Sequence, residues 1–163
     1  MATFKTANCK GKYFDENAKA DVINYVLNPY KMPHNCYGGV KVEEHNIAKS
    51  MQTVSEQFGK SDGVQLRHFI ISFSKNEVSS PYTTDVIARD ILYYLGREYQ
   101  AIYGVHENGD IHIHIVMNSV SYVDGHRYYG KKKEYYAFYY ALRNILRRYG
   151  INKLMCVSNK EKC

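Results

Sequence analysis

Residues 106–116 read HENGDIHIHIV, and three of these eleven residues are histidines. Side chains two residues apart along a strand project from the same face, so His112 and His114 share one face and the intervening isoleucines line the other. His106 precedes ENGD, a link rich in turn formers, which indicates a β-hairpin that returns His106 beside this pair. Three neutral imidazoles can hold a metal ion and leave coordination positions open for a substrate oxygen. Three histidines so close in sequence favour this metal site over ordinary core or surface positions.

Outward from this strand, hydrophobic periodicity divides the chain into helices and strands. Helices are predicted near 18–27, 47–58, 84–95 and 133–149, and strands at the amino terminus and at 67–73, 100–105 and 111–120. The apolar stripe from Ile47 to Phe58 is predicted to face the core, and PHNCYGG (33–39) to form a loop. A hairpin, with helices between the other strands, indicates the α+β class. We expect a two-layer sandwich of helices packed on a central, mostly antiparallel sheet.

The composition is that of a basic, tyrosine-rich domain, and it favours a polyanionic partner, nucleic acid first. The chain has 22 Lys and Arg residues against 16 Asp and Glu, a net charge of +6, and 17 tyrosines. Tyrosine offers a flat face for base stacking and a phenol that can bond phosphate. Part of the positive charge is clustered, and DNA-phosphate contacts are predicted for Lys131, Lys132, Lys133, Arg143 and Arg147. A solvated helix face is the alternative interpretation of this cluster.

The remaining composition argues against several other classes of protein. The four cysteines are scattered without a CxxC pair, unlike a zinc knuckle or a disulfide scaffold. The first residues, MATFKTANCKGKYF, lack the apolar segment of a signal peptide, and no apolar run is long enough to cross a bilayer. We expect a single soluble domain over residues 1–163, in which about the last ten residues form a short strand and a frayed tail.

Three blocks of the sequence resemble the relaxase, or mobilisation nuclease, family, and most closely its MobP-type branch. They are NYVLNPYK (24–31), RHFIISFSKNE (67–77) and HENGDIHIHIVMNSV (106–120), in the family's order. The last block contains the histidine–hydrophobic–histidine motif after which the HUH endonucleases are named. The resemblance covers about residues 10–150. It implies the HUH-type α+β sandwich and a site-specific, single-strand DNA endonuclease and strand transferase.

The resemblance also implies a biological setting. Such a protein acts in the bacterial cytoplasm, where it nicks one DNA strand at an origin of transfer during plasmid or integrative-element mobilisation. Its partners are single-stranded DNA and accessory mobilisation proteins. The family's metal is Mg²⁺ or Mn²⁺, whereas ligation by imidazoles alone suits Zn²⁺, Ni²⁺ or Mn²⁺ better than Mg²⁺. We expect Mn²⁺ or Mg²⁺ as the working ion.

The family's first motif places its catalytic tyrosine at the end of the first helix, which corresponds here to Tyr25. A phenolate that attacks a DNA phosphate forms a 5′-phosphotyrosyl bond and frees a 3′-hydroxyl, so the phosphodiester is conserved for rejoining. An unperturbed phenol has a pKa of about 10 and needs a base or a nearby cation for this attack. Packing against the helix core is the alternative role of Tyr25, and Tyr30 is the competing nucleophile.

The second and third blocks supply further candidates. His68 and Glu77 match the family's second motif and are expected to be catalytic, His68 by proton transfer or by supporting a metal ligand. Ser72 lies on the same predicted strand face as His68 and is expected to contact DNA phosphate. Asn118, on the same face of its strand as His114, is expected to orient a ligand or to bind phosphate.

One departure from the family pattern lies inside HENGD. Two positions after the first histidine the family commonly carries an acidic residue, and this chain has Asn108. The difference leaves His68 and Glu77 as alternatives to His106 in the metal site. Asp110 is a candidate for a carboxylate that supports a metal ligand, with a hairpin-turn role as its alternative.

Two other functions compete with that of a relaxase. A rolling-circle replication initiator shares the histidine motif but usually places its tyrosine after the histidines, and here Tyr25 precedes them. A catalytically degenerate, DNA-binding relaxase remnant is favoured by Asn108 and by the small size of the chain. A metal-dependent covalent adduct with DNA separates the enzyme from the remnant.

Overall fold

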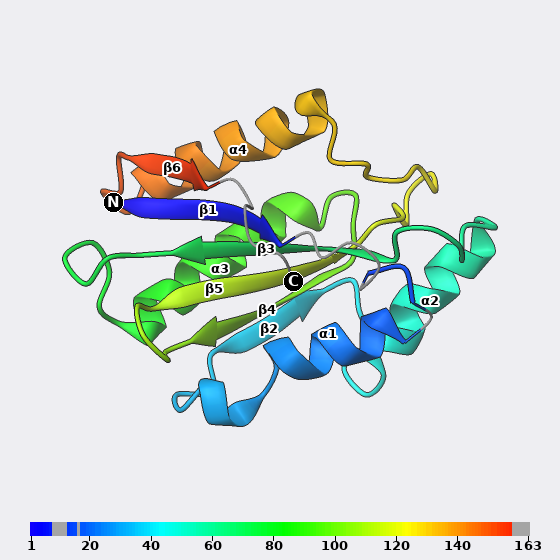
Figure 1. The fold of residues 1–163 in the computed structure, drawn as a ribbon, viewed down its shortest axis with the longest axis horizontal. Helices are drawn as coiled ribbons and strands as arrows, with labels where there is room; N and C mark the ends of the chain where they lie inside the picture. The colour runs from blue at the N-terminus through cyan, green and yellow to red at the C-terminus, as the bar shows by residue number, and fades with distance from the viewer. Residues whose placement is uncertain (8–12, 16, 158–163) are drawn as a thin grey trace.

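The computed structural model describes residues 1–7, 13–15 and 17–157, which form one six-stranded sheet with helices on both of its faces (Figure 1). The strands are β1 (Ala2–Ala7), β2 (Tyr37–Val40), β3 (Leu66–Ser72), β4 (Ala101–His106), β5 (His112–Asn118) and β6 (Leu154–Val157). The helices are α1 (Ala18–Val26), α2 (Ile47–Gln57), α3 (Pro81–Leu95) and α4 (Lys132–Arg147), with a short 3₁₀ helix, Pro29–Lys31, after α1. The predicted α+β class is confirmed.

The strand order places the histidine-bearing strand inside the sheet. The order is β2-β4-β5-β3-β1-β6, and every pairing is antiparallel except that of β1 with β6. The predicted hairpin is present, because β4 pairs with β5 and His106 lies opposite His112. Gly109 turns the link at a φ of 92°, a region that glycine adopts without steric cost. β5 is therefore flanked by β4 on one side and β3 on the other.

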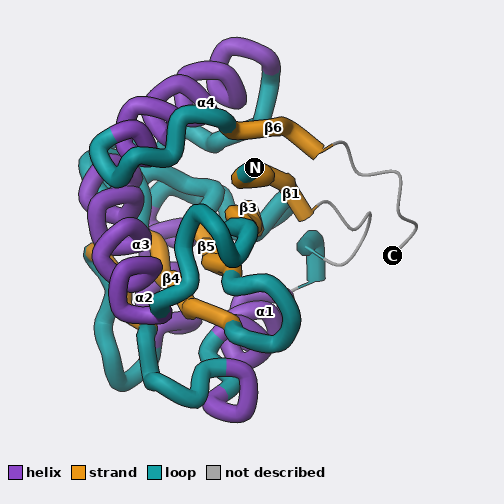
Figure 2. The backbone as a smooth tube through the Cα atoms, turned by 90° about the vertical axis from the view of Figure 1, so that its left-hand side faces the viewer, coloured by secondary structure: helices purple, strands orange, loops and turns teal. Residues whose placement is uncertain are grey.

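Alternation along the strands sends side chains into two cores, one on each face of the sheet. Ile113 and Ile115 of β5 pack in one core with Phe138 of α4 and with α3. Val116 of β5 packs in the other core with α1 and α2. Figure 2 shows α3 and α4 on one side of the strands and α1 on the other. The predicted two-layer sandwich thus has a third layer, in which α1 covers β4 and β5 and α2 packs beside α1.

The loop prediction for residues 33–39 is wrong at its end. Tyr37–Val40 is strand β2, which pairs with β4 at the edge of the sheet. The strand was hidden by its two glycines, because glycine has a low strand propensity. These glycines allow close packing: a Cβ added at Gly38 would lie 2.8 Å from the ring of Tyr103.

The apolar stripe of α2 is only partly in the core. Met51 is fully buried, whereas Phe58 lies just beyond the helix end and is 37% exposed. Phe58 covers the turn at Gly125, where an added Cβ would overlap its ring. The predicted helix is therefore confirmed, but the predicted burial of Phe58 is wrong.

Three further expectations concern the surface and the termini. No helix among the described residues combines the length and the apolar character needed to cross a bilayer. Cys36 and Cys156 are free thiols, while Cys9 and Cys163 lie outside the described residues. The predicted carboxy-terminal strand is β6, and the tail after it also falls outside the described residues.

Candidate active site

The three predicted metal ligands meet at the turn end of the β4–β5 hairpin. One nitrogen of each imidazole lies within 4.8 Å of a nitrogen of each of the other two. The ring centroids of His106 and His114 are 4.2 Å apart, and those of His112 and His114 are 4.9 Å apart. His106 and His114 are buried, and His112 is half-buried. Within residues 1–7, 13–15 and 17–157, no other group of three His, Cys, Asp or Glu side chains is placed to share a metal ion.

Backbone carbonyls hold two of these imidazoles. The Nε2–H of His106 donates to the carbonyl oxygen of Val26, the last residue of α1, at 2.7 Å. The Nδ1–H of His112 donates to the carbonyl oxygen of Asp110 in the hairpin link, also at 2.7 Å. Each bond fixes one ring nitrogen as a donor and leaves the other with a free lone pair. Metal-ligating histidines are commonly oriented in this way.

The ring nitrogens of the three histidines that do not take part in these orienting bonds are suited to bind a metal ion. Nδ1 of His106 is buried and has no hydrogen-bond partner in the described structure, and an unpaired buried acceptor is costly. His114 has its Nδ1 engaged, 2.7 Å from Nε2 of His68, which leaves its own Nε2 for the cluster. Three nitrogen ligands bind a divalent ion and leave further positions open. The residues present therefore fit the metal that the sequence predicts.

The electrostatics of the cluster favour neutral imidazoles. Burial lowers the pKa of His106 and His114 below the ordinary histidine value, and neighbouring imidazoles and Lys31 lower the pKa of both further. Both rings are therefore neutral at neutral pH. A metal ion binds the neutral imidazole, so it displaces no proton from these two ligands.

Tyr25, in the last turn of α1, lies against the histidines. Its ring centroid is 5.6 Å from that of His114 and 5.9 Å from that of His106. The side chain is 46% exposed, so a strand of DNA can reach it from solvent. The Nζ atom of Lys31 lies 3.8 Å from the centroid of the Tyr25 ring. The sequence assigned no role to Lys31, although it closes the NPYK block.

Tyr30, the competing nucleophile, lies in the 3₁₀ helix after α1. Its side chain is 96% exposed, and it makes no ring contact with the histidines. The structure therefore brings Tyr25, and not Tyr30, to the histidine cluster.

The residues of the second block divide between two places. His68 lies behind His114, bonded to it through Nε2, and is not one of the three clustered ligands. Ser72 lies opposite His112 across the β3–β5 pairing and is half-buried. Glu77 is not one of the clustered ligands, and its carboxylate accepts hydrogen bonds from Ser74 and pairs with the amino group of Met1. The catalytic role of Glu77 stays a prediction.

Asn118 has an internal role in place of the predicted contact with phosphate. Its side chain is fully buried, and its amide nitrogen donates to the carbonyl of Met51 and to Gln100 Oε1, each at 3.0 Å. Its side-chain oxygen accepts from the amide of Val120. These bonds connect the end of β5 to α2, and we do not retain Asn118 as a DNA-binding residue.

The HENGD link contributes backbone to the site, not carboxylates. Asn108 is exposed and takes no part in the cluster. Asp110 supports His112 through its backbone carbonyl, a bond made from within the hairpin turn. The carboxylate of Glu107 pairs instead with His34, at 2.8 Å. The His106 position thus needs no acidic neighbour to orient it, since Val26 does so.

The predicted DNA-binding cations lie away from the histidines. Lys131, Lys132 and Lys133 begin α4 and are exposed, and Arg147 ends it, also exposed. α4 packs on the face of the sheet opposite that of α1 and the cluster (Figures 1 and 2). The structure therefore separates these cations from the candidate metal site.

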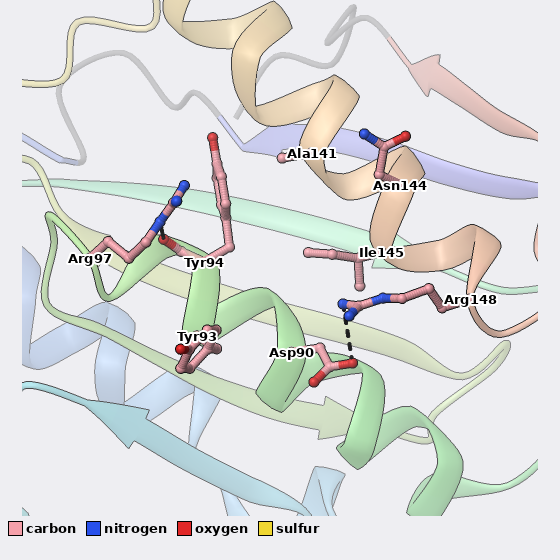
Figure 3. Close-up of a pocket in the computed structure, with 8 residues that line it drawn as sticks. All are labelled: Asp90, Tyr93, Tyr94, Arg97, Ala141, Asn144, Ile145 and Arg148. Atoms are coloured by element: carbon pink, nitrogen blue, oxygen red, sulfur yellow. Dashed lines mark hydrogen bonds and ion pairs between the residues drawn. The ribbon is translucent and has the colours of Figure 1, made fainter.

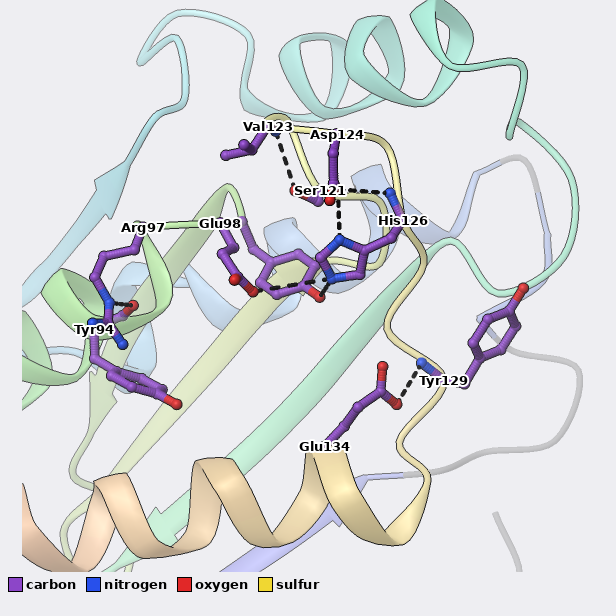
Figure 4. Close-up of polar contacts among 10 residues, drawn as sticks. Tyr94, Arg97, Glu98, Ser121, Val123, Asp124, His126, Tyr129 and Glu134 are labelled. Atoms are coloured by element: carbon purple, nitrogen blue, oxygen red, sulfur yellow. Dashed lines mark hydrogen bonds and ion pairs between the residues drawn. The ribbon is translucent and has the colours of Figure 1, made fainter.

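Two other polar regions lie on the α3–α4 side. A groove between α3 and α4 is lined by Tyr93 and Arg148, and Arg148 pairs with Asp90 at 3.4 Å (Figure 3). Near the end of α3, His126 faces Asp124, with their side-chain atoms 2.5 Å apart (Figure 4). Neither region contacts the histidine cluster.

Comparison with known families adds an independent finding. A family model described as the nuclease domain of MobA/VirD2-like relaxases matches residues 25–151, well over half of the chain. The matched span begins at Tyr25 and includes all three clustered histidines. No curated protein matches the chain.

Proposed function

This chain belongs to the MobA/VirD2-like relaxase family, and from that premise we propose that it is a metal-dependent endonuclease and strand transferase acting on single-stranded DNA. Its biological role in this proposal is to nick one strand at an origin of transfer during mobilisation of a plasmid or integrative element. The observation that carries the proposal is the contact of Tyr25 with His106 and His114. The proposed nucleophile and three candidate metal ligands thus lie together at one partly exposed point.

In the proposed reaction the phenolate oxygen of Tyr25 attacks a DNA phosphorus atom. A bond forms between Tyr25 Oη and phosphorus as the bond from phosphorus to the 3′-oxygen breaks. The proton that the Tyr25 phenol loses balances the one that the 3′-oxygen takes up as it becomes a 3′-hydroxyl. The protein is then joined to the 5′-phosphate of the downstream strand. Attack by a 3′-hydroxyl reverses the step and rejoins or transfers the strand.

The chain's own residues orient and stabilise this attack. The ammonium group of Lys31 lies 3.8 Å from the centroid of the Tyr25 ring, which places a positive charge beside the proposed nucleophile, where a DNA phosphate must approach. Val26, next to Tyr25, holds His106 through its carbonyl, so the end of α1 fixes both the nucleophile and one ligand. A divalent ion held by the three histidines would supply positive charge to the non-bridging phosphate oxygens. Mn²⁺ or Mg²⁺ is our proposed ion.

DNA is proposed to approach along the face of the sheet that carries the cluster. Ser72, opposite His112, is the candidate for a phosphate contact on that face, and Thr3 lies opposite Ser72 on β1. Accessory mobilisation proteins and action in the bacterial cytoplasm stay predictions from the family. The retention of Tyr25 and of all three ligands favours an active enzyme over a degenerate remnant.

The test is a covalent adduct on a denaturing gel. Single-stranded oligonucleotides tiled across the DNA that flanks the gene are labelled at the 3′ end or at the 5′ end and incubated with protein and Mn²⁺. The 3′ label should migrate with the protein and the 5′ label should be released, because the 5′-phosphate of the downstream strand is retained. EDTA should abolish the adduct.

The matched variants are Tyr25→Phe and Tyr30→Phe. The first should form no adduct, and the second should form it at the wild-type level, since Tyr30 lies away from the histidines. An adduct that persists in Tyr25→Phe, or that carries the 5′ label, would contradict the proposed nucleophile and polarity. DNA binding without cleavage in any divalent ion would favour the remnant.

A further inference from the structure

A buried hydrogen-bonded chain leads away from the candidate metal site. Nδ1 of His114 lies 2.7 Å from Nε2 of His68, and Nδ1 of His68 lies 3.1 Å from the hydroxyl of Tyr13. The exposed fractions of the three side chains are 3%, 5% and 6%. We propose that His68 and Tyr13 are positioning residues that hold His114 in the tautomer and orientation needed to bind the metal. The inference rests on the proposed function.

The protons of the chain can be placed in only one order if His114 is a ligand. Its Nε2 must then carry the lone pair, so its Nδ1 carries the proton and donates to Nε2 of His68. His68, with Nε2 as acceptor, is protonated at Nδ1 and donates to the hydroxyl oxygen of Tyr13. Burial raises the pKa of Tyr13 to about 12, so this phenol stays neutral. The Nδ1–H of each imidazole thus has an acceptor, Nε2 of His68 for His114 and the hydroxyl oxygen of Tyr13 for His68.

His114 needs side-chain support because of where it lies in the sheet. His106 and His112 are near strand ends, and loop or helix-end carbonyls reach them. His114 is inside β5, where Ile70 of β3 lies directly opposite and His68 lies diagonally, opposite Val116. The acceptor for His114 therefore comes from a side chain of the neighbouring strand.

Tyr13 is itself fixed against β3. Its carbonyl oxygen accepts a hydrogen bond from the amide of Gln65, just before β3, at 2.8 Å. Its ring meets that of His68 edge-on, with centroids 6.3 Å apart. The orientation of the ligand on β5 thus depends on two residues that are distant in sequence but packed behind it.

The test measures Mn²⁺ affinity directly, without DNA. His68→Leu removes the acceptor and leaves the Nδ1–H of His114 unpaired in a buried position, so the dissociation constant for Mn²⁺ should rise about 10- to 100-fold. His68→Gln, whose side-chain carbonyl can accept the same bond, should recover most of the affinity. Tyr13→Phe should weaken binding less, because it removes only the end of the chain.

Equilibrium dialysis gives the affinities, and thermal unfolding in EDTA shows whether each variant is folded. His112→Ala serves as the control that removes a ligand. A folded His68→Leu protein that binds Mn²⁺ as tightly as wild type would overturn the positioning role and leave the proposed function standing. Wild-type protein that binds no Mn²⁺ would overturn both. A loss of thermal stability alone, with unchanged affinity, would show a purely structural role.

Discussion

At the scale of single residues, the three clustered histidines are held by three different acceptors. His106 is tied to a helix-end carbonyl, His112 to a hairpin carbonyl and His114 to another imidazole. Only His112 is substantially accessible to solvent. A site built in this way presents its lone pairs before any ion binds, which lowers the ordering cost of binding.

The buried Lys19 should make the free energy of unfolding depend on pH. This lysine is 3% exposed, and its ammonium group donates to Gln52 and Gln65 at 3.0 and 2.9 Å. Burial, with a contribution from Arg127, lowers the pKa of Lys19 from 10.5 to about 8. Between these two values the unfolded chain binds more protons than the folded chain. The free energy of unfolding should therefore rise with pH through this window, whereas below about pH 8 the full cost of the buried charge is present.

The comparison that isolates this effect uses Lys19→Met, in urea denaturation at about pH 7 and about pH 9.5. Wild type should gain roughly 1 to 2 kcal/mol relative to the variant between the two conditions. Staying below pH 10 avoids Tyr13, whose raised pKa acts in the opposite direction at higher pH. A difference between the two proteins that does not change with pH would show that Lys19 keeps an ordinary pKa.

At the scale of elements, the site depends on how closely α1 approaches β4. A Cβ added at Gly104, which lies opposite His114, would be 2.5 Å from the carbonyl oxygen of Val26 and 3.0 Å from Sδ of Met32. Gly104→Ala should therefore push the end of α1 away from β4 and disturb the Val26 bond to His106. We expect a loss of about 1 to 3 kcal/mol in stability and roughly tenfold weaker Mn²⁺ binding.

Gly59→Ala is the matched control for that experiment. Gly59 has a φ of 63°, and an added Cβ there meets nothing within 4 Å. The substitution should cost about 1 kcal/mol from backbone strain and leave metal affinity unchanged. If Gly104→Ala bound Mn²⁺ as tightly as Gly59→Ala, the contact between α1 and β4 would have no part in shaping the site.

Local patterns explain which elements and contacts could be predicted from sequence. The alternation in IHIHIV and the ENGD link indicated β5, its hairpin and the convergence of the histidines, because both signals lie within a few residues. The partner of His114 could not be predicted in the same way. It depends on the register of β3 against β5, which places His68 opposite Val116. Tyr13, one of 17 tyrosines, carried no signal at all.

At the scale of the whole molecule, a stripe of cations and tyrosines lies on the opposite face of the sheet from the histidine cluster. The outer side of α4 carries Lys133, Tyr136, Tyr140, Arg143 and Arg147 at alternating three- and four-residue spacing. Residues so spaced lie along one side of a helix. This stripe lies on the α3–α4 side of the sheet, whereas Tyr25 lies on the α1 side. A strand bound at the cluster must therefore extend around the molecule to reach the stripe.

Because the α4 stripe and Tyr25 lie on opposite faces, the cations of the stripe should affect the binding of long DNA strands but not adduct formation on short ones. The triple variant of Lys133, Arg143 and Arg147 to Ala should bind long single strands more weakly, with the logarithmic salt slope reduced by about 2. Fluorescence anisotropy in EDTA with Tyr25→Phe protein measures this binding without cleavage. Adduct formation on a short oligonucleotide should be unaffected in the triple variant that retains Tyr25.

The control replaces three exposed cations that lie outside α4, Lys49, Lys75 and Lys153, and removes the same net charge. This control should change the salt slope less than the α4 variant does. Equal effects of the two triple variants would show a general charge effect and no specific contact along α4. The outcome separates a solvated helix face from a DNA-binding one.

The central claim is that a metal ion at the three histidines directs Tyr25 onto a DNA phosphate. Mass spectrometry of protein treated with cleavable single-stranded DNA tests it most directly. Tyr25 and Tyr30 fall in one tryptic peptide, residues 20–31, so fragment ions must locate the nucleotide. We expect a 5′-phosphonucleotide on Tyr25 in Mn²⁺ and none in EDTA or in His114→Ala. A nucleotide on Tyr30, or on Tyr25 without any divalent ion, would contradict this account.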